Sequence, residues 1–376
     1  MDKKNKNPNV PNLRFSSFAD SFRIYTLKEV LQRVSFPVTV EENKLYYQIG
    51  IRSHSKGIFY KEAEIGKQIG NKRIFWIEPN CLILNIVFAW EQAVAKTSEK
   101  EVGMVASHRF PMYKVLNNSL DYIVDFFKTE KGKQLLQMAS PGGAGRNKTL
   151  NQDFFLNSKI YLPSLNEQLK TSELIELIEG RIETQIKIIR VLESQKKELS
   201  KILFNKYCKD SSYYPLEDIV SSESIKDFQI QTKDYLPNGK FEVVDQGKKE
   251  IIGYSDNSNK LYTKVPVIVY GDHTTIIKYR EIPFIVGGDG VKLLKAKTGF
   301  LQKYIYYAVC QFNISSEGYK RHWNMLKNVL IPIPNYETQK IIIDTLDSFT
   351  KKIKNEEALL EKYRLQKQFL LNNLFI

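Results

Sequence analysis

One segment of this chain occurs twice, and the repeat limits what the chain can fold into. Residues 160–204 and 331–375 align without a gap. Each copy opens with a short stretch that contains proline and continues as a long run whose apolar residues recur at alternating steps of three and four. That spacing is typical of a helix with a coiled-coil seam. The chain is therefore expected to alternate two blocks of mixed sequence with two long helices.

The composition bounds the class of protein. A length of 376 residues suits two or three domains, and 42% hydrophobic residues with 12% aromatic residues predict globular ones. Lys and Arg number 56 against 42 Asp and Glu, which gives a net charge of +14 spread over both blocks. This excess suits a long anionic partner such as nucleic acid. An acidic protein partner, or a merely solvated surface, would also fit the charge.

Cysteine usage and apolar stretches indicate the compartment. Cys81, Cys208 and Cys310 are isolated and lack the spacing of metal ligands, so we expect no metal site and no disulfide framework. The longest apolar stretch, residues 81–90, is too short to span a bilayer, and the N-terminus has no apolar signal core. A cytoplasmic protein without membrane insertion is expected.

Both blocks consist largely of short β-like runs separated by turn residues, which predicts mixed α/β (α+β) domains. One helix is expected in each block, over residues 119–138 with Ser119 as N-cap, and over residues 301–310. The blocks open with similar residues, 25–30 and 214–219, but share no further ungapped identity. They are expected to be related scaffolds that carry different surfaces.

Catalytic motifs are not found in the sequence. It has no GxGxxG after a strand, no GxxxxGK[ST], no Asn/Asp-Pro-Pro-aromatic tetrapeptide and no HExxH, and only four histidines. We therefore predict no catalytic residue. Two Gly-rich turns, 140–148 and 286–292, could instead place backbone N–H groups and a cation against a phosphate. Either could equally be a structural turn, but the presence of one in each block favours a binding role.

Several segments resemble the DNA-specificity subunit of Type I restriction-modification enzymes, and the likeness extends over nearly the whole chain. They are the arm at residues 10–15, the junctions 160–168 and 331–339, the ending 370–375, the run 146–154 in the first block, and residues 270–274, 283–290 and 318–323 in the second. The second junction departs from the family pattern, because Thr338 stands where the first has Glu167. We expect this to be a surface difference of little consequence.

The resemblance implies a non-catalytic subunit that recognises an asymmetric bipartite site in double-stranded DNA. It would bind two methyltransferase subunits and, through them, restriction subunits, and would direct adenine methylation and cleavage. S-adenosylmethionine, ATP and magnesium would then belong to the partner subunits, with no cofactor in this chain. The domains would be an N-terminal arm (1–20), target recognition domain 1 (21–163), spacer helix 1 (164–207), target recognition domain 2 (208–333) and spacer helix 2 (334–376).

The two spacer helices are expected to form an antiparallel coiled coil, which makes the chain a pseudo-two-fold tandem repeat. A helical seam of 29 residues is about 44 Å long. That length can separate two recognition domains by one turn of DNA, about 34 Å, as two half-sites require.

Two other classes of protein remain open. One is a non-catalytic coiled-coil scaffold that binds nucleic acid or protein without sequence specificity, and it would tolerate changes in both blocks. The other is a stand-alone nuclease or a fused methyltransferase. The missing motifs oppose this second reading, whereas binding of S-adenosylmethionine by the purified chain would support it.

DNA contacts are predicted at side chains that can reach a phosphate or a base edge and that have turn-rich surroundings. Each of them could instead be a solvated surface group. The predicted contacts are Lys72, Arg73, His108, Arg109, Arg146, Asn147 and Lys148 in the first block and Lys248, His273, Thr274, Asp289, Lys292, Arg321 and His322 in the second.

Two polar residues interrupt each helical seam, and a buried unpaired charge would be costly. An antiparallel register would let Lys196 meet Glu356 and Gln185 meet Lys367 at the same time. Alternatively, the two lysines extend out of the seam into solvent.

Overall fold

The computed structural model describes residues 10–143, 148–318 and 320–376. It consists of two compact units. Unit 1 contains Met1–Ile186 and Leu359–Ile376, and unit 2 contains Lys187–Ala358. Among the residues so described, no helix is long and apolar enough to cross a membrane.

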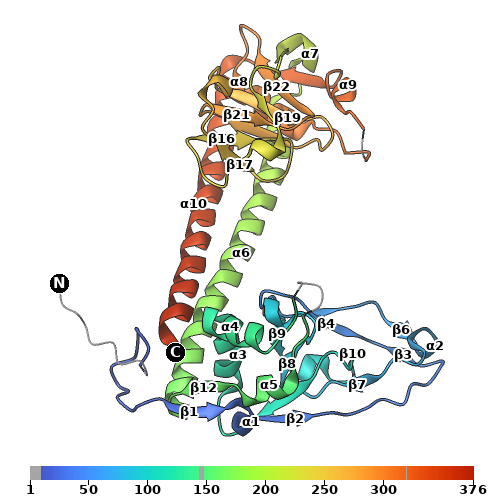
Figure 1. Ribbon diagram of the computed structural model, residues 1–376. Coiled ribbons are helices and arrows are strands. Elements are labelled where there is room, and N and C mark those ends of the chain that lie inside the picture. Colours follow the sequence, from blue (N-terminus) through green and yellow to red (C-terminus); the bar gives the residue numbers. More distant parts are fainter. Residues whose placement is uncertain (1–9, 144–147, 319) are drawn as a thin grey trace, which may run out of the picture. The chain divides into compact units, whose positions relative to one another are not determined.

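Two long helices contribute to both units (Figure 1). They are α6 (Leu165–Tyr207) and α10 (Tyr336–Leu374). Unit 1 holds the start of α6 with the end of α10, and unit 2 holds the end of α6 with the start of α10. Within each unit the two helix segments therefore run antiparallel, as predicted. The seam positions that recur at alternating steps of three and four from Ile175 to Leu203, and from Leu346 to Leu374, are all buried or half-buried, which confirms the periodicity.

Unit 1 is built on a four-stranded sheet of order β2-β11-β8-β9, with strand pairs β1-β12, β10-β7, β3-β6 and β4-β5 around it. Its strands are β1 (Arg23–Thr26), β2 (Leu31–Val34), β3 (Leu45–Tyr46), β4 (Ile49–Ile51), β5 (Ile58–Tyr60), β6 (Glu64–Ile65), β7 (Ile74–Trp76), β8 (Leu82–Leu84), β9 (Val94–Lys96), β10 (Val105–Ser107), β11 (Met112–Val115) and β12 (Lys159–Leu162). Its helices are α1 (Leu27–Val30), α2 (Gly66–Ile69), α3 (Leu120–Lys128), α4 (Glu130–Met138) and α5 (Gln152–Asn157), with 3-10 turns η1 (Ala89–Glu91) and η2 (Glu99–Glu101).

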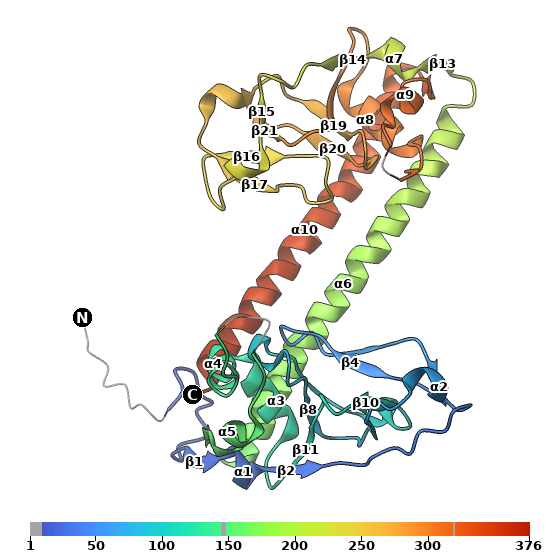
Figure 2. The same cartoon turned by 45° about the vertical axis from the view of Figure 1, so that its right-hand side comes forward.

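Unit 2 is built on a four-stranded sheet of order β14-β22-β19-β20, a second sheet of order β15-β21-β16-β17 with β18 on β21, and the pair β13-β23 (Figure 2). Its strands are β13 (Ser212–Pro215), β14 (Val220–Glu223), β15 (Gln229–Ile230), β16 (Phe241–Val244), β17 (Gly253–Ser255), β18 (Leu261–Tyr262), β19 (Val267–Gly271), β20 (Ile277–Arg280), β21 (Phe284–Gly287), β22 (Val291–Ala296) and β23 (Leu330–Ile333). Its helices are α7 (Leu216–Ile219), α8 (Gln302–Gln311) and α9 (Trp323–Leu326), with 3-10 turns η4 (Thr232–Asp234) and η5 (Ser258–Lys260).

The two units share one plan in spite of their dissimilar sequences. The four-stranded sheets correspond strand by strand, β2 to β14, β11 to β22, β8 to β19 and β9 to β20. In each unit the first strand pairs with the strand that leads into a long helix, Tyr25 opposite Ile160 and Tyr214 opposite Ile331. The last strand of each four-stranded sheet to appear in the chain is followed by a helix, α3 or α8. The mixed α/β fold is therefore confirmed, with α6 between two sheet-rich blocks.

The duplicated residues make the same contacts in both units. Gln168 Nε2 donates to the Pro163 carbonyl at 3.0 Å, and Gln339 Nε2 donates to the Pro334 carbonyl at 2.9 Å. Phe375 lies 4.7 Å from the ring of Tyr122 on α3, and its counterpart Phe204 lies 5.8 Å from the ring of Tyr304 on α8. Each unit thus combines the start of one copy with the end of the other.

The predicted helices need one correction. The helix expected over residues 119–138 is two helices, because Thr129 ends α3 and its hydroxyl accepts from the Gly132 N–H to cap α4. Ser119 is the N-cap of α3, as predicted. The second expected helix, over residues 301–310, is α8.

The difference between Glu167 and Thr338 is not a surface difference. Glu167 is buried, and both of its carboxylate oxygens accept from the Arg14 guanidinium at 2.7 Å. Arg14 belongs to the N-terminal arm, whose Leu13 N–H also donates to the Asn373 carbonyl on α10 at 2.9 Å. Glu167 therefore holds the arm against unit 1, which explains why the first junction has a carboxylate.

Candidate nucleic-acid interface

Several turns of unit 2 meet where β16, β19 and β21 end. β16 and β21 are parallel, so their carboxyl ends share one sheet edge, and Gly271 at the end of β19 lies opposite Val291. We call residues 245–249, 272–276, 288–290 and 320–322 the loop cluster. Its turns are linked by hydrogen bonds: Thr274 Oγ1 donates to the Gln246 carbonyl at 2.6 Å, and His273 Nδ1 lies 3.0 Å from the Lys320 carbonyl.

The backbone of the loop cluster explains its glycines. Gly288 and Gly290 have φ of +64° and +76°, a region that L side chains rarely adopt. The Gly-rich turn predicted here is therefore a tight structural turn that also presents Asp289. Gln229 Nε2 donates to Asp289 Oδ1 at 2.8 Å, which fixes that exposed carboxylate.

A buried lysine supports the loop cluster from inside. Lys278 is 3% exposed, and its ammonium donates to the carbonyls of Asp245 and Lys249 at 2.8 and 2.5 Å. Burial lowers the pKa of Lys278, while the nearby Asp245 carboxylate opposes that shift. The sequence analysis missed this residue, because a lysine in a β-strand pattern looks like a solvent-facing position.

His322 is not a DNA contact in this structure. It is fully buried, and its Nε2 accepts from the Glu317 N–H at 3.0 Å. Nδ1 must then carry the proton, and it donates to the Asp272 carbonyl at 2.9 Å. We therefore correct its predicted role, since both ring nitrogens hold residues 317 and 322 against the end of β19.

The other residues predicted in the second block lie in or beside the loop cluster. Lys248, Asp289 and Arg321 are exposed, and His273, Thr274 and Lys292 are half-buried. Their side chains combine donors for phosphates with groups that can reach base edges. The structure thus brings together six predicted residues from four separate segments of the chain.

The first block has a smaller gathering of basic residues. Arg73 precedes β7 and His108 follows β10, and the His108 N–H donates to the Arg73 carbonyl at 3.2 Å. Both line a hollow of about 240 Å³ with Arg33, a residue that the sequence analysis did not select. The hollow is cationic and open, so it could accommodate a phosphate.

The remaining predictions for the first block are more scattered. Lys72 and Arg109 are exposed, and the Lys148 ammonium lies 5.0 Å from the centre of the Trp90 ring. Arg146 and Asn147 lie outside the described residues. Within the ranges that the structure describes, no group of His, Cys, Asp and Glu could hold a metal ion.

Comparison with known proteins agrees with the fold. A family model described as the Type I restriction modification DNA specificity domain matches residues 209–362. Over 154 residues, the chain is 28% identical to the Type I restriction enzyme EcoR124I/EcoR124II specificity subunit of Escherichia coli. The second block and the first part of the following helix therefore match the Type I restriction modification DNA specificity domain. The match to the Escherichia coli subunit covers 37% of this chain and 38% of that protein.

Two solved structures have a fold similar to that of this chain. The S subunit of a Type I restriction-modification system from M. genitalium aligns over 98% of this chain and 99% of its own, with a TM-score of 0.60 at 14% identity. A chain from a structural study of complex assembly and conformational transition of the type I R-M system aligns over 94% and 97%, with a TM-score of 0.56 at 14% identity. The fold match thus extends over both blocks, whereas the family model matches only from residue 209.

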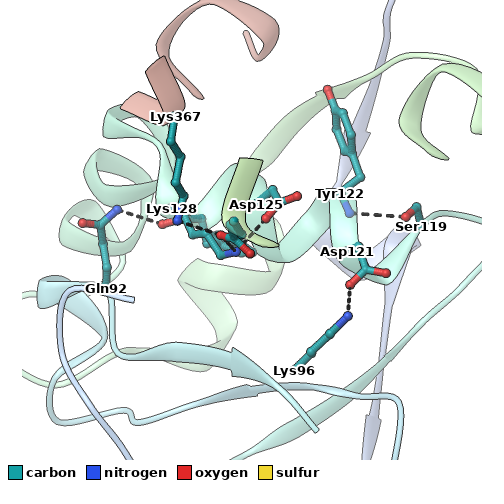
Figure 3. A network of polar contacts seen from close by, with 10 residues as sticks. Gln92, Lys96, Ser119, Asp121, Tyr122, Asp125, Lys128 and Lys367 are labelled. Carbon is teal, nitrogen blue, oxygen red and sulfur yellow. Dashed lines mark hydrogen bonds and ion pairs between the residues drawn. The ribbon is translucent and has the colours of Figure 1, made fainter. Parts of the chain in front are cut away.

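The lysines that interrupt the helical seams are linked to the recognition blocks, Lys367 through Glu179 of α6 and Lys196 directly. In unit 1, Lys367 on α10 pairs with Glu179 at 2.7 Å, and Glu179 pairs with Lys128 of α3 at 2.9 Å (Figure 3). Lys128 also pairs with Asp125 at 2.8 Å. Burial raises the pKa of Asp125 to about 6, although Lys128 opposes that shift.

In unit 2, the counterpart Lys196 lies 5.5 Å from the centre of the Tyr307 ring on α8. The Tyr307 hydroxyl hydrogen-bonds to Asp347 and lies 3.2 Å from Thr350 Oγ1. Burial lowers the pKa of Lys196.

Lys367 pairs with Glu179, which lies six residues before its predicted partner Gln185 on α6. The predicted pairs of Gln185 with Lys367 and of Lys196 with Glu356 stay predictions. The sequence could not show that each lysine would be linked to the adjoining block, Lys196 directly and Lys367 through Glu179.

Proposed function

We propose that this chain is the sequence-reading subunit of a Type I restriction-modification complex. Each unit reads one short DNA element, and the two elements differ, so the site is bipartite and asymmetric. The chain carries out no chemistry itself. Methyltransferase subunits modify adenine, and restriction subunits cleave, at sites that this chain selects.

One observation carries the proposal. The same sheet plan is built twice, and the loops that each sheet presents differ in sequence and chemistry. In unit 2 the loop cluster combines a fixed acceptor, Asp289, with donors at Lys248 and Arg321. Acceptors and donors in one surface suit base edges, whereas a purely phosphate-binding surface needs donors alone.

The partners follow from this role. The complex would contain two methyltransferase subunits, which hold S-adenosylmethionine, and restriction subunits, which hold ATP and magnesium. The chain would bind double-stranded DNA in the cytoplasm without a cofactor of its own. The net charge of +14 supports association with DNA.

Sequencing of modified bases tests the proposal. The chain is expressed with its methyltransferase subunit in a host that lacks adenine methylation, and modified adenines are mapped across the genome. We expect methylation confined to one asymmetric sequence with two short specified parts and an unread spacer. Methylation at unrelated sequences, or DNA binding without any sequence preference, would favour the scaffold reading instead.

A further inference from the structure

The side chain of Gln246 connects two turns of the loop cluster. Its Nε2 donates to the Asp289 carbonyl at 2.8 Å, and its Oε1 accepts from the His273 N–H at 3.1 Å. One amide group therefore donates to the 288–290 turn and accepts from the 272–276 turn. Both turns carry residues with side chains suited to base edges, namely Asp289 and His273.

The surrounding chain leaves room for this bridge. A Cβ added to Gly290 would lie 2.6 Å from Gln246 Nε2 and 2.6 Å from His273 Cδ2. A Cβ added to Gly271 would lie 2.9 Å from Gln246 Cβ and 2.2 Å from Thr274 Oγ1. All four distances are shorter than real Cβ contacts, so glycine at these two positions leaves the space in which the Gln246 side chain lies.

The residue that bridges the turns is itself held in place. The Gln246 carbonyl accepts from Thr274 Oγ1, and the carbonyl of the preceding Asp245 accepts from the buried Lys278 ammonium. The amide therefore projects from a fixed backbone and can fix other groups in turn. Gln246 is half-buried, with the turns on either side of it.

We propose that Gln246 is a positioning residue for DNA recognition by unit 2. It holds the two turns in one arrangement, so that Asp289 and His273 face the same base pairs together. Asp289 then accepts from an exocyclic amino group, for which cytosine N4 is the usual partner of a carboxylate. Gln246 acts through these two residues and does not itself contact DNA. This inference rests on the proposed function.

Three variants test the bridge in the complex with the methyltransferase subunit. Gln246→Ala removes both hydrogen bonds of the amide. Gln246→Glu keeps an acceptor for the His273 N–H but loses the donor to Asp289, so it should release the 288–290 turn alone. Gly290→Ala fills the slot and should displace the amide. Gln137→Ala on α4 of unit 1, where the glutamine is exposed, is the matched control.

The readout is the base preference at each position of the methylated sequence, with the melting curve of each variant followed by Trp323 fluorescence in a background with Trp76→Phe and Trp90→Phe. We expect Gln246→Ala to reduce the base preference in one half of the site by about tenfold or more, the size of one lost base contact. The other half should be unchanged, and the melting curve should stay close to that of the wild type. Gly290→Ala should act on the same positions, and Gln246→Glu on fewer of them.

Other outcomes overturn the inference. A uniform loss of methylation without a change in base preference would show that Gln246 is merely structural, and an unchanged preference would show that the turns do not need the bridge. If the Gln246→Ala chain melts at a much lower temperature than the wild type, the base preference of the Gln246→Glu chain is the test, because glutamate has the same shape as glutamine. A wild-type chain that directs no bipartite methylation would instead refute the proposed function.

Discussion

The two units attach their blocks to the long helices through different side-chain contacts. Each must fix a recognition block to a pair of antiparallel helix segments, and each uses the same lysine of the duplicated segment. In unit 1 Lys367 joins an ion-pair chain that runs through Glu179 and Lys128 to Asp125. In unit 2 Lys196 lies over an aromatic ring. The duplicated helix therefore places a lysine at the same position in both units. The residues around that lysine decide whether it forms an ion pair or lies over an aromatic ring.

The difference follows from single positions. Glu179 in the first copy corresponds to Thr350 in the second. Lys128 of α3 is charged and mostly buried, whereas α8 presents Tyr307. The ion-pair chain depends on pH through the Asp125 and Glu179 carboxylates, whereas the contact with the ring depends on pH through the Lys196 ammonium, whose pKa burial lowers. The ion-pair chain of unit 1 and the Lys196–Tyr307 contact of unit 2 should therefore respond differently to a change of pH or to loss of a charge.

The largest effect is expected from pH. The pKa of Asp125 is raised by burial from its ordinary value of 3.8 to about 6. The folded state therefore binds this proton more tightly than the unfolded state. The contribution of Asp125 to the free energy of unfolding of unit 1 should rise by about 3 kcal/mol as the pH falls from 7 through 6 to below 4.

Asp125→Asn isolates that contribution, because other carboxylates also titrate in this range. The difference in unfolding free energy between wild type and variant should change with pH as stated. Trp76 and Trp90 report on unit 1 in a Trp323→Phe background, with urea as denaturant. Asp121→Asn, an exposed carboxylate on the same helix, is the control. A pH-independent difference for Asp125→Asn would contradict the account.

A smaller effect is expected from the shared carboxylate of unit 1. Glu179→Gln leaves the Lys128 and Lys367 ammonium groups close together without the negative charge between them. Because Glu179 is about one-third exposed, solvent offsets part of the loss, and we expect unit 1 to lose about 2 kcal/mol. Thr350→Val at the corresponding position should cost unit 2 less. Equal losses of unfolding free energy for Glu179→Gln and Thr350→Val would contradict the difference between the two units.

The smallest effect is expected when the seam lysines lose their charge. Lys196→Met keeps the apolar stem and removes an ammonium that burial already disfavours, so unit 2 should change by less than about 1 kcal/mol. Lys367→Met loses an ion pair and should cost unit 1 about 1 kcal/mol. Urea unfolding followed by Trp323 alone, and by Trp76 and Trp90 alone, separates the two units. A larger loss for Lys196→Met than for Lys367→Met would reverse the comparison.

Periodicity and duplication predict the parts of this fold that depend on local pattern. The two long helices, their antiparallel pairing and the division into similar blocks follow from apolar spacing and repeated residues. The common sheet order of the two blocks could not be seen, because β strands pair across long loops and the two blocks share little identity. The break at Thr129 was missed because the apolar pattern continues across it.

The sequence indicates which residue types belong to the candidate site, but it does not indicate which of these side chains are buried. Turn residues with polar side chains do collect in the loop cluster, as His273 and Asp289 show. His322 has the same chemistry, but it faces the interior, and a single sequence gives no sign of that. Gln246 and Lys278 were missed because their roles depend on neighbours more than 25 residues away in the chain.

The central claim is that each block reads one half of the DNA site independently. Its most direct test replaces residues 21–163 with the corresponding block of a solved S subunit of the same fold and maps the methylated adenines. The account predicts that one half of the methylated sequence changes while the other half and the spacer length stay the same. A change in both halves would contradict it.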